Sequence, residues 1–463
     1  MRSSELRFRA VKRRPRETPE PSSSSLARPS ASLDHPAALT PLAGMRDLLP
    51  PESHARRKVS EQLQGVFESY GYDLLTTPLF ERVEVFERGL SLDPRDLLRF
   101  VEPDGGEVAA LRPDITPQIA RVVSTRLSDY PPPFRLRYEG TVIRRRRGRA
   151  RRQRQIAQVG VELVGISGAE GDVEVIRLIA DACMAAGLST FRLELSDVGV
   201  GRTLLREQSP GLLALAAESL ARKDEAQLET ILVAAGVAPA ARARITALAH
   251  LHGGLEVLDE AERIVHGTAA APHVESLREV ARQLVALGLG PKLGVDLGEI
   301  RGFAYYTGVS FALFAHGPGE AIASGGRYDD LLAQYGAPQP ATGAGIDIEN
   351  LLSALDFAGL RWRERDVSRF VVAGAPRERV EALAASVRQA GRAAATLGAL
   401  DVEQARAYAR SWAYDIALVY AADTLLAVRS RDGKTRELRN ELFPQDFHAL
   451  ASWARDTEAT EQL

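Results

Sequence analysis

The chain has 463 residues, 45% of them hydrophobic, a formal net charge of -2 and one cysteine, Cys183, and its length favours two or three domains over one core. The charge argues against a generally basic nucleic-acid binder, and a single cysteine excludes an intrachain disulfide and a cysteine-based zinc cluster. No run of about eighteen apolar residues occurs, which argues against a membrane span, and the composition fits a reducing cytoplasm.

Residues 1–40 are rich in Arg, Pro and Ser and show no periodic apolar pattern. We predict a disordered leader here. The segment lacks the apolar core of a secretory signal, and its acidic residues argue against an organelle transit peptide. The alternative is a translation start nearer Met45.

Helical spacing first appears at Val59, Leu63 and Phe67, which favours a helix over residues 53–70 that ends at Gly71. The first strand is expected at 72–80 and has Pro78 near its end. The other strands expected before residue 200 lie at 97–102, 107–112, 134–142, 156–164 and 191–195. The further helices expected there are a short one after residue 80, one at 117–127 and a capped one at 172–187.

The stretch LRPDITP, Leu111–Pro117, places an arginine, a carboxylate and a hydroxyl within five positions at an expected strand-to-helix junction. We predict Thr116 as the N-cap and Pro117 in the first helical turn. Asp114 and Thr116 would then lie where side chains and free backbone N–H groups can converge on a small polar ligand. The plainer alternative is an ordinary capped helix start.

Eight arginines lie between Arg144 and Arg154, in the loop between two expected strands. Such a loop is usually a solvated connection, although one held over a pocket could grip phosphates. In the strand that follows, Gln158 and Glu162 are four residues apart. Both side chains should therefore lie on one face and can share a pocket.

Residues 201–289 change to an Ala- and Leu-rich helical pattern with few aromatic residues, which indicates an inserted helical subdomain. Strands are expected after it at 292–299, 303–314, 322–328 and 343–348, followed by a helix through Leu351 and Leu355. Beyond a composition break near Glu364, strands at 370–373, 415–420 and 425–429, helices at 377–390 and 402–412, and an Asp432-Gly433 hairpin turn are expected.

This alternation of strands and helices in the tail indicates a small α/β domain. The chain is therefore divided into a leader (1–40), a core (41–200 with 290–362), a helical insertion (201–289) and a C-terminal α/β domain (366–463).

Several motifs together resemble the catalytic core of histidyl-tRNA synthetase, a class II aminoacyl-tRNA synthetase built on an antiparallel sheet. They are LRPDIT (111–116), LRYEG (136–140), QVGVELVG (158–165), RGFAYYTG (301–308) and GGRYD (325–329). The resemblance covers about residues 42–355, and the tail is similar to that family's anticodon-binding domain. The implied fold class is α+β, with a class II synthetase-like antiparallel sheet, a helical insertion and a small C-terminal α/β domain.

The resemblance implies a site for free histidine, with an ammonium, a carboxylate and an imidazole to recognise. Its residues would be Asp114, Thr116 and Gln158 for the ammonium, Glu162 and Tyr306 for the imidazole with Tyr305 beside them, and Arg301 for the carboxylate. The alternative from the residues alone is that the two tyrosines are core aromatics and Glu162 is a hydrogen-bonded buried acid. No metal and no cofactor is implied.

The main departures from the synthetase pattern lie at the positions that bind the phosphates of ATP. Arg137 fits the arginine of the second motif, and we expect it to be at most a vestigial phosphate contact. The third motif should read Gly-x-Gly-x-x-x-Glu-Arg, whereas Gly343, Gly345 and Glu349 are followed here by Asn350. Loss of one preorganised charge stabiliser costs about 3 to 4 kcal/mol. The chain should therefore sense histidine rather than activate it.

Two smaller departures are Ala304, where the synthetase usually has Asp, and Asp114, where it has Glu. The whole combination resembles the regulatory subunits of ATP phosphoribosyltransferase. This resemblance implies a chain with no catalytic residues that joins the short catalytic subunit in a hetero-oligomer, acts in the first step of histidine biosynthesis and transmits feedback inhibition by histidine in the cytoplasm. It also implies self-association as a dimer, with no tRNA and no membrane as partner.

Three points stay open at this stage. The alternative function is a histidyl-tRNA synthetase with a divergent third motif. A further alternative makes the loop at 144–154 a tRNA-binding element. The complete α/β tail after Glu364 is a departure from the regulatory family, which often has little there.

Overall fold

The computed structural model describes residues 40–89, 97–144, 153–300, 305–360, 368–422, 424–439 and 442–455. Nearly all of the expected leader lies outside these ranges. Within them, no helix is both long enough and apolar enough to cross a membrane.

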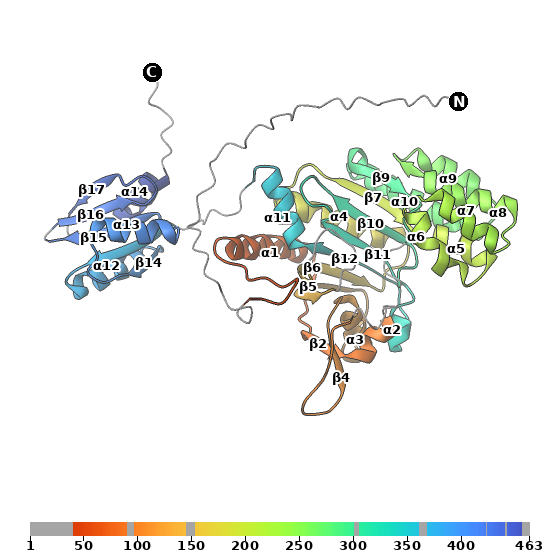
Figure 1. The fold of residues 1–463 in the computed structure, drawn as a ribbon, viewed down its shortest axis with the longest axis horizontal. Helices are drawn as coiled ribbons and strands as arrows, with labels where there is room; N and C mark the ends of the chain where they lie inside the picture. Colours follow the sequence, from red (N-terminus) through yellow and green to blue (C-terminus); the bar gives the residue numbers. More distant parts are fainter. Residues whose placement is uncertain are drawn as a thin grey trace, which may run out of the picture. The chain divides into compact units, whose positions relative to one another are not determined.

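A mixed, mostly antiparallel sheet forms the centre of the fold (Figure 1). Neighbouring strands pair antiparallel except at the β1–β5 and β7–β9 pairs, which are parallel. Within the described residues the strand order is β1 (Asp73–Leu74), β5 (Phe134–Ile143), β6 (Gln155–Val164), β12 (Ala341–Asp347), β11 (Ala323–Arg327), β10 (Val309–Phe314), β7 (Arg192–Asp197), β9 (Leu293–Asp296) and β8 (His252–Gly253).

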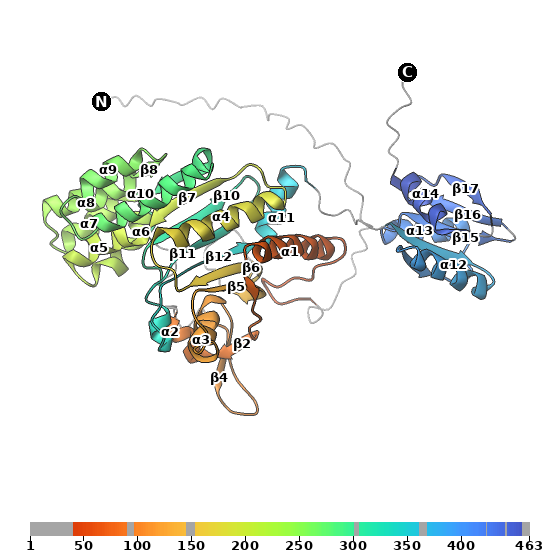
Figure 2. The ribbon, with the colours of Figure 1, turned by 180° about the vertical axis from the view of Figure 1, so that it is seen from behind.

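Four helices pack on one face of this sheet, which we call the helix face. They are α1 (Glu52–Ser69), α4 (Ala169–Ala185), α10 (Ala271–Ala286) and α11 (Ile348–Phe357), and Figure 2 shows α1 and α4 lying across the strands. The odd-numbered residues Val159, Val161 and Leu163 of β6 are fully buried here with the apolar side of α1 and α4. Their burial fixes the even-numbered residues of β6 on the opposite face.

The opposite face, which we call the site face, carries a smaller core. Leu136 and Tyr138 of β5 pack there with Ile115 and Ile119 at the start of α3 (Thr116–Arg126). The elements around α3 are the small antiparallel sheet β2 (Phe80–Arg82), β4 (Val108–Leu111) and β3 (Arg99–Val101), the helix α2 (Val83–Gly89) and the 3-10 helix η5 (Leu332–Tyr335). Arg112 holds β4 to this region, since its guanidinium donates to the carbonyl oxygens of Thr77 and Thr141 at 3.0 and 2.8 Å.

The inserted segment between β7 and β9 is helical, as the sequence predicts. Its helices within the described residues are α5 (Val198–Gln208), α6 (Leu212–Ala221), α7 (Glu225–Ala234), α8 (Pro239–Ala247), η3 (Leu248–His250), α9 (Val257–Val265), α10 (Ala271–Ala286) and η4 (Gly290–Lys292). The insertion begins at Asp197, whose carboxylate caps α5 by accepting from the Gly199 N–H at 2.8 Å. Two of its residues form β8 at the sheet edge, which the sequence pattern does not indicate.

The C-terminal α/β module has its own sheet, with helices on both faces and two separate apolar clusters. Its strands, in sheet order, are β14 (Ala393–Thr396), β13 (Arg369–Gly374), β15 (Ile416–Ala421), β16 (Thr424–Arg429) and β17 (Thr435–Leu438), and its helices are α12 (Arg377–Gln389), α13 (Val402–Ser411) and α14 (Pro444–Arg455). The hairpin turn at Gly433, with a φ of 77°, is confirmed. The sequence analysis did not identify β14, β17 or α14.

Several element boundaries differ from prediction; the strand expected at 303–314, for example, begins at Val309. The strand expected at 72–80 is two short strands on either side of Pro78, because that residue has no N–H for a ladder. The helix expected to begin at Asp172 begins at Ala169 without a side-chain cap. Asp172 is instead 2% exposed and accepts a hydrogen bond from Arg327.

Arg327, in β11, connects this helix end to the sheet. Its Nε is 3.0 Å from Asp172 Oδ2, its Nη1 is 3.0 Å from Asp329 Oδ1, and its Nη2 donates to the Gly168 carbonyl at 2.7 Å. Burial raises the pKa of Asp172 to about 6, although the arginine acts against this. The cation beside Asp172 therefore favours the charged form of this buried carboxyl.

We predict that Arg327→Met lowers the free energy of unfolding by about 3 to 5 kcal/mol near neutral pH, because it leaves an unpaired buried carboxylate. Urea unfolding measures the loss. Adding Asp172→Asn should recover part of it, and Arg222→Met, which removes an exposed ion pair with Glu218, should cost less than about 1 kcal/mol. A loss below about 1 kcal/mol for Arg327→Met would contradict the prediction.

Candidate functional site

The floor of the candidate site is formed by the even-numbered residues of β6. Gln158, Gly160 and Glu162 lie on the site face, which confirms that Gln158 and Glu162 share a face. The neighbouring strand β12 places Gly343 opposite Glu162 and Gly345 opposite Gly160. A Cβ at Gly343 would overlap the Glu162 carboxylate, and one at Gly345 would overlap the Gln158 amide. The two third-motif glycines therefore provide the space in which these side chains lie.

Glu162 is the most enclosed polar group of the site, with 1% exposure. It accepts hydrogen bonds from the Thr116 hydroxyl at 2.6 Å and from the Tyr328 hydroxyl. Burial raises the pKa of Glu162 to about 8, the two hydroxyl groups act to lower it, and the charge of Asp114 raises it further. No cation of the described residues lies within ion-pair distance of Glu162. The carboxyl is therefore protonated at neutral pH in the free chain.

Thr116 is not the N-cap that the sequence predicts. It is the first residue of α3, the cap position belongs to Ile115, and no side chain caps the helix. The Thr116 hydroxyl binds Glu162 instead, because the chain turns into the sheet floor at this point. A tertiary contact has replaced the local one.

Asp114 is a second buried carboxylate, 3% exposed, at the junction between β4 and α3. Its Oδ1 accepts from the Ile115 N–H at 2.8 Å, and its Oδ2 accepts from the Tyr305 hydroxyl at 2.7 Å. The Arg144 Nη2 is 3.7 Å from Asp114 Oδ1. Two carboxyl groups thus approach one site, and Asp114 has the Arg144 cation beside it.

The remaining predicted side chains complete the walls. Tyr305 and Tyr306 pack edge to face with ring centroids 5.2 Å apart, and Tyr306 belongs to the apolar cluster of the site face. Both rings therefore pack in the apolar core, which was the alternative that the sequence left open for them. The Tyr305 hydroxyl also donates to Asp114. The Gln158 Oε1 is buried and accepts no hydrogen bond from the described residues. An unpaired buried acceptor of this kind is free for a donor on a ligand.

The structure does not bring Arg137 to this site. Arg137 is an odd-numbered residue of β5 and lies on the helix face, where it donates to the Gln64 Oε1 at 2.7 Å and to the Tyr72 carbonyl at 2.9 Å. Its third contact is Glu68, 3.1 Å away. The arginine on the site face is Arg144, which donates to the Pro113 carbonyl at 2.7 Å. Counting alternate residues along the strand from Tyr138 would have identified it.

The side chain at position 350 is an amide that is hydrogen bonded within the fold. The Asn350 Nδ2 donates to the Ala321 carbonyl at 2.8 Å, and Asn350 is 5% exposed. The neighbouring Glu349 accepts from the Ala157 N–H at 3.1 Å. Arg301, Ala304 and residues 145–152 of the arginine loop lie outside the described residues.

Comparisons with known proteins agree on one family and one fold. A family model described as histidyl-tRNA synthetase matches residues 44–351. The chain is 41% identical to the ATP phosphoribosyltransferase regulatory subunit of Moorella thermoacetica over 67% of this chain and 81% of that protein. It is 42% identical to the regulatory subunit of Anaeromyxobacter dehalogenans over 69% of this chain and 93% of that protein.

Solved structures show the same fold. One described as an ATP phosphoribosyltransferase regulatory subunit/histidyl-tRNA synthetase from Bacillus halodurans matches with a TM-score of 0.72 and 27% identity, covering 84% of this chain and 100% of that chain. The histidyl-tRNA synthetase of Nostoc matches with a TM-score of 0.71 and 21% identity, covering 89% of this chain and 99% of that chain, and this likeness shows the fold alone. The expected class II synthetase-like fold is thereby confirmed.

The protonation of Glu162 predicts a pH dependence of stability. The folded-state pKa of about 8 exceeds the ordinary value of 4.5. The stability contributed by the protonated carboxyl is therefore complete below pH 4.5 and is lost as the pH rises through 8. The variant Glu162→Gln cannot ionise, so its melting temperature relative to the unchanged chain should be higher at about pH 9 than at about pH 5.5. Thermal unfolding at both pH values measures this, and an equal difference would contradict it.

Proposed function

This chain belongs to the family of ATP phosphoribosyltransferase regulatory subunits, which has the histidyl-tRNA synthetase fold, and from this we propose that it binds free L-histidine at the Glu162 site and inhibits a catalytic phosphoribosyltransferase subunit in response. Its named relatives are regulatory rather than catalytic subunits. The proposal assigns the chain to the first step of histidine biosynthesis in the cytoplasm, within a hetero-oligomer.

The observation that carries the proposal is the gathering of Asp114, Glu162 and the unpaired Gln158 Oε1 on one face. These groups fit the two nitrogen-bearing ends of histidine. The Asp114 carboxylate, the Thr116 hydroxyl and the Gln158 oxygen suit an ammonium group, and Glu162 with Tyr306 suits an imidazole. Arg301 is proposed for the ligand carboxylate from the resemblance of its motif.

Proton balance also supports an imidazole at Glu162. Free Glu162 holds its proton up to about pH 8, and a free imidazole loses its proton near pH 6.5. At neutral pH the pair therefore carries one proton before and after contact, whichever partner holds it. A neutral carboxyl and a neutral imidazole can form a hydrogen bond here without taking up or releasing a proton.

The same residues argue against activation of histidine with ATP. Asn350 gives no positive charge where the third motif of a synthetase has arginine, and its amide is hydrogen bonded to Ala321. Arg137 lies on the helix face with Gln64 and Glu68. An amino-acid pocket without this phosphate clamp favours binding over chemistry.

Regulation requires a difference in affinity. Histidine can shift an assembly toward an inhibited state only if it binds that state more tightly than the active one. The required partner is the short catalytic subunit, and we further propose self-association of this chain as a dimer, with neither tRNA nor a membrane as partner.

A histidyl-tRNA synthetase with a divergent third motif is the second candidate. It is favoured by the description of the matching family model and by that of the Bacillus halodurans structure, which names both functions. It requires adenylate formation, which the first candidate does not.

We predict that Glu162→Ala abolishes histidine binding while the fold remains intact, because the imidazole loses its buried hydrogen-bond partner. Isothermal titration calorimetry measures the binding, and circular dichroism checks the fold. Glu139→Ala, on the exposed opposite face of β5, is the matched control and should bind histidine normally. Unchanged affinity in Glu162→Ala would contradict the placement.

Reconstitution tests the regulatory role. Mixing this chain with a short catalytic subunit should raise phosphoribosyl-ATP formation and make it sensitive to histidine. Glu162→Ala should keep the activation and lose the sensitivity, because assembly does not need the pocket. No gain in activity would reject the proposal, and histidine-dependent exchange of pyrophosphate into ATP would decide for the synthetase.

A further inference from the structure

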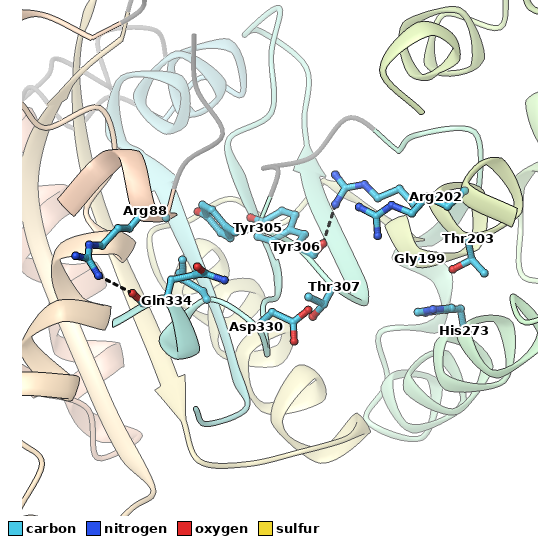
Figure 3. Close-up of a pocket in the computed structure, with 13 residues that line it drawn as sticks. Arg88, Gly199, Arg202, Thr203, His273, Tyr305, Tyr306, Thr307, Asp330 and Gln334 are labelled. Carbon is cyan, nitrogen blue, oxygen red and sulfur yellow. Dashed lines mark hydrogen bonds between the residues drawn. The ribbon is translucent and has the colours of Figure 1, made fainter. Parts of the chain in front are cut away.

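A buried arginine of the helical insertion holds the backbone of Tyr305 and Tyr306, the pair that we call the tyrosine wall. This residue is Arg202, which lies in α5 and is 7% exposed. Its Nη1 donates to the Tyr306 carbonyl at 2.7 Å, beside a cavity of about 400 Å³ (Figure 3). Its Nη2 donates to the Ile300 carbonyl at 3.1 Å. One guanidinium group thus ties together two backbone positions, one on each side of residues 301–304.

The first turn of α5 packs closely on its neighbours around this contact. A Cβ at Gly201 would lie 2.6 Å from the Ile300 side chain, so only glycine fits there without a shift. A Cβ at Gly199 would overlap the imidazole of His273, which comes from α10. These two close approaches fix the place from which Arg202 reaches the tyrosine wall.

The buried carboxylate of Asp197 supports the same turn. It accepts from the Gly199 N–H at 2.8 Å and lies 3.0 Å from the His273 Nδ1. Its hydrogen bond raises the pKa of His273. Burial lowers the pKa of Arg202, as does the charge of Arg206, whereas the charge of Asp197 raises it. Asp197 therefore favours the charged forms of both His273 and Arg202.

Aromatic contacts lead from the tyrosine wall to both carboxyl groups of the candidate site. The rings of Tyr305 and Tyr306 pack edge to face, and Tyr305 packs in the same way on Tyr328, with centroids 5.6 Å apart. The Tyr305 hydroxyl donates to Asp114, and the Tyr328 hydroxyl donates to Glu162. A shift of the Tyr306 backbone would therefore displace side chains that hold Asp114 and Glu162.

We propose that Arg202 is a positioning residue of the histidine site, through which the helical insertion sets the place of the tyrosine wall. The inference rests on the proposed function. Burying a guanidinium group costs free energy, which its hydrogen bonds must offset. An apolar side chain could fill the same space without that cost, but it could not hold two carbonyl groups. The planar guanidinium holds them because its N–H groups point in fixed directions.

A further contact of α5 reaches the same segment. The Val198 N–H donates to the Gly308 carbonyl at 3.3 Å, and Val198 packs with Tyr306 in the apolar cluster of the site face. The bond from Arg202 to Tyr306 is shorter and has a charged donor, so it should be the stronger of the two. Through it, a change in the place of α5 should alter histidine binding, and histidine should act on α5 with an equal and reciprocal effect.

Calorimetric titration of the full chain with L-histidine tests the proposal. Arg202→Gln should bind about tenfold more weakly than the unchanged chain, because an amide cannot hold both carbonyl groups. Arg202→Lys should bind with an affinity between the two, since an ammonium group lacks the planar fork, and this variant decides if Arg202→Gln does not fold. A double-mutant cycle with Tyr306→Phe separates positioning from a general loss of stability. The two losses should not add, because both changes act through Tyr306.

The matched control is Arg429→Gln, in the sheet of the C-terminal module. Arg429 is 3% exposed and donates to the Trp453 carbonyl at 3.0 Å, so the same kind of buried bond is removed from a different sheet. This variant should lose stability and keep full histidine affinity. Equal affinity in the Arg202 variants and the unchanged chain would overturn the inference and leave the proposed function standing, as would losses that add in the cycle. An unchanged chain that binds no histidine would overturn both.

Discussion

The burial of Glu162 in a site with no cation beside it, among the described residues, is the constraint on which the proposed function depends. A carboxyl group taken out of water must be paired, hydrogen bonded or protonated. Here two hydroxyl groups bind it, and its raised pKa keeps a proton on it. A neutral carboxyl of this kind can form a hydrogen bond with a nitrogen-bearing ligand, as the proposed function requires.

The two faces of the central sheet differ in what they bury: one holds the main apolar core and the other holds the candidate site. The helix face buries a continuous set of Val, Leu and Ile side chains under α1 and α4, and this packing fixes the register of β6. Once the register is fixed, the side chains of Gln158 and Glu162 must lie on the site face. Arg137, at an odd-numbered position, is assigned by the same rule to the helix face and to α1.

The third motif separates into two physical roles in this chain. Gly343 and Gly345 give room to the side chains of Glu162 and Gln158, so the pocket floor requires them. Position 350 has no part in that floor, and its amide is hydrogen bonded to the backbone at Ala321. A chain can therefore keep the glycines and lose the arginine.

The sequence by itself determined the order and type of most elements, the helical insertion and the shared face of Gln158 and Glu162, because these follow from periodicity and local spacing. The antiparallel class of the core came from the resemblance of its motifs to those of the histidyl-tRNA synthetase family. Only the tertiary structure decided that Thr116 binds Glu162 instead of capping α3, that Asp172 pairs with Arg327, and that Arg144 rather than Arg137 lies on the site face. Short elements such as β8 and β14 were also decided there, since pairing with a neighbouring strand defines them more than their residues do. The reason is general: local preferences are worth about 1 kcal/mol, whereas the burial of a charge or a strand register is worth several.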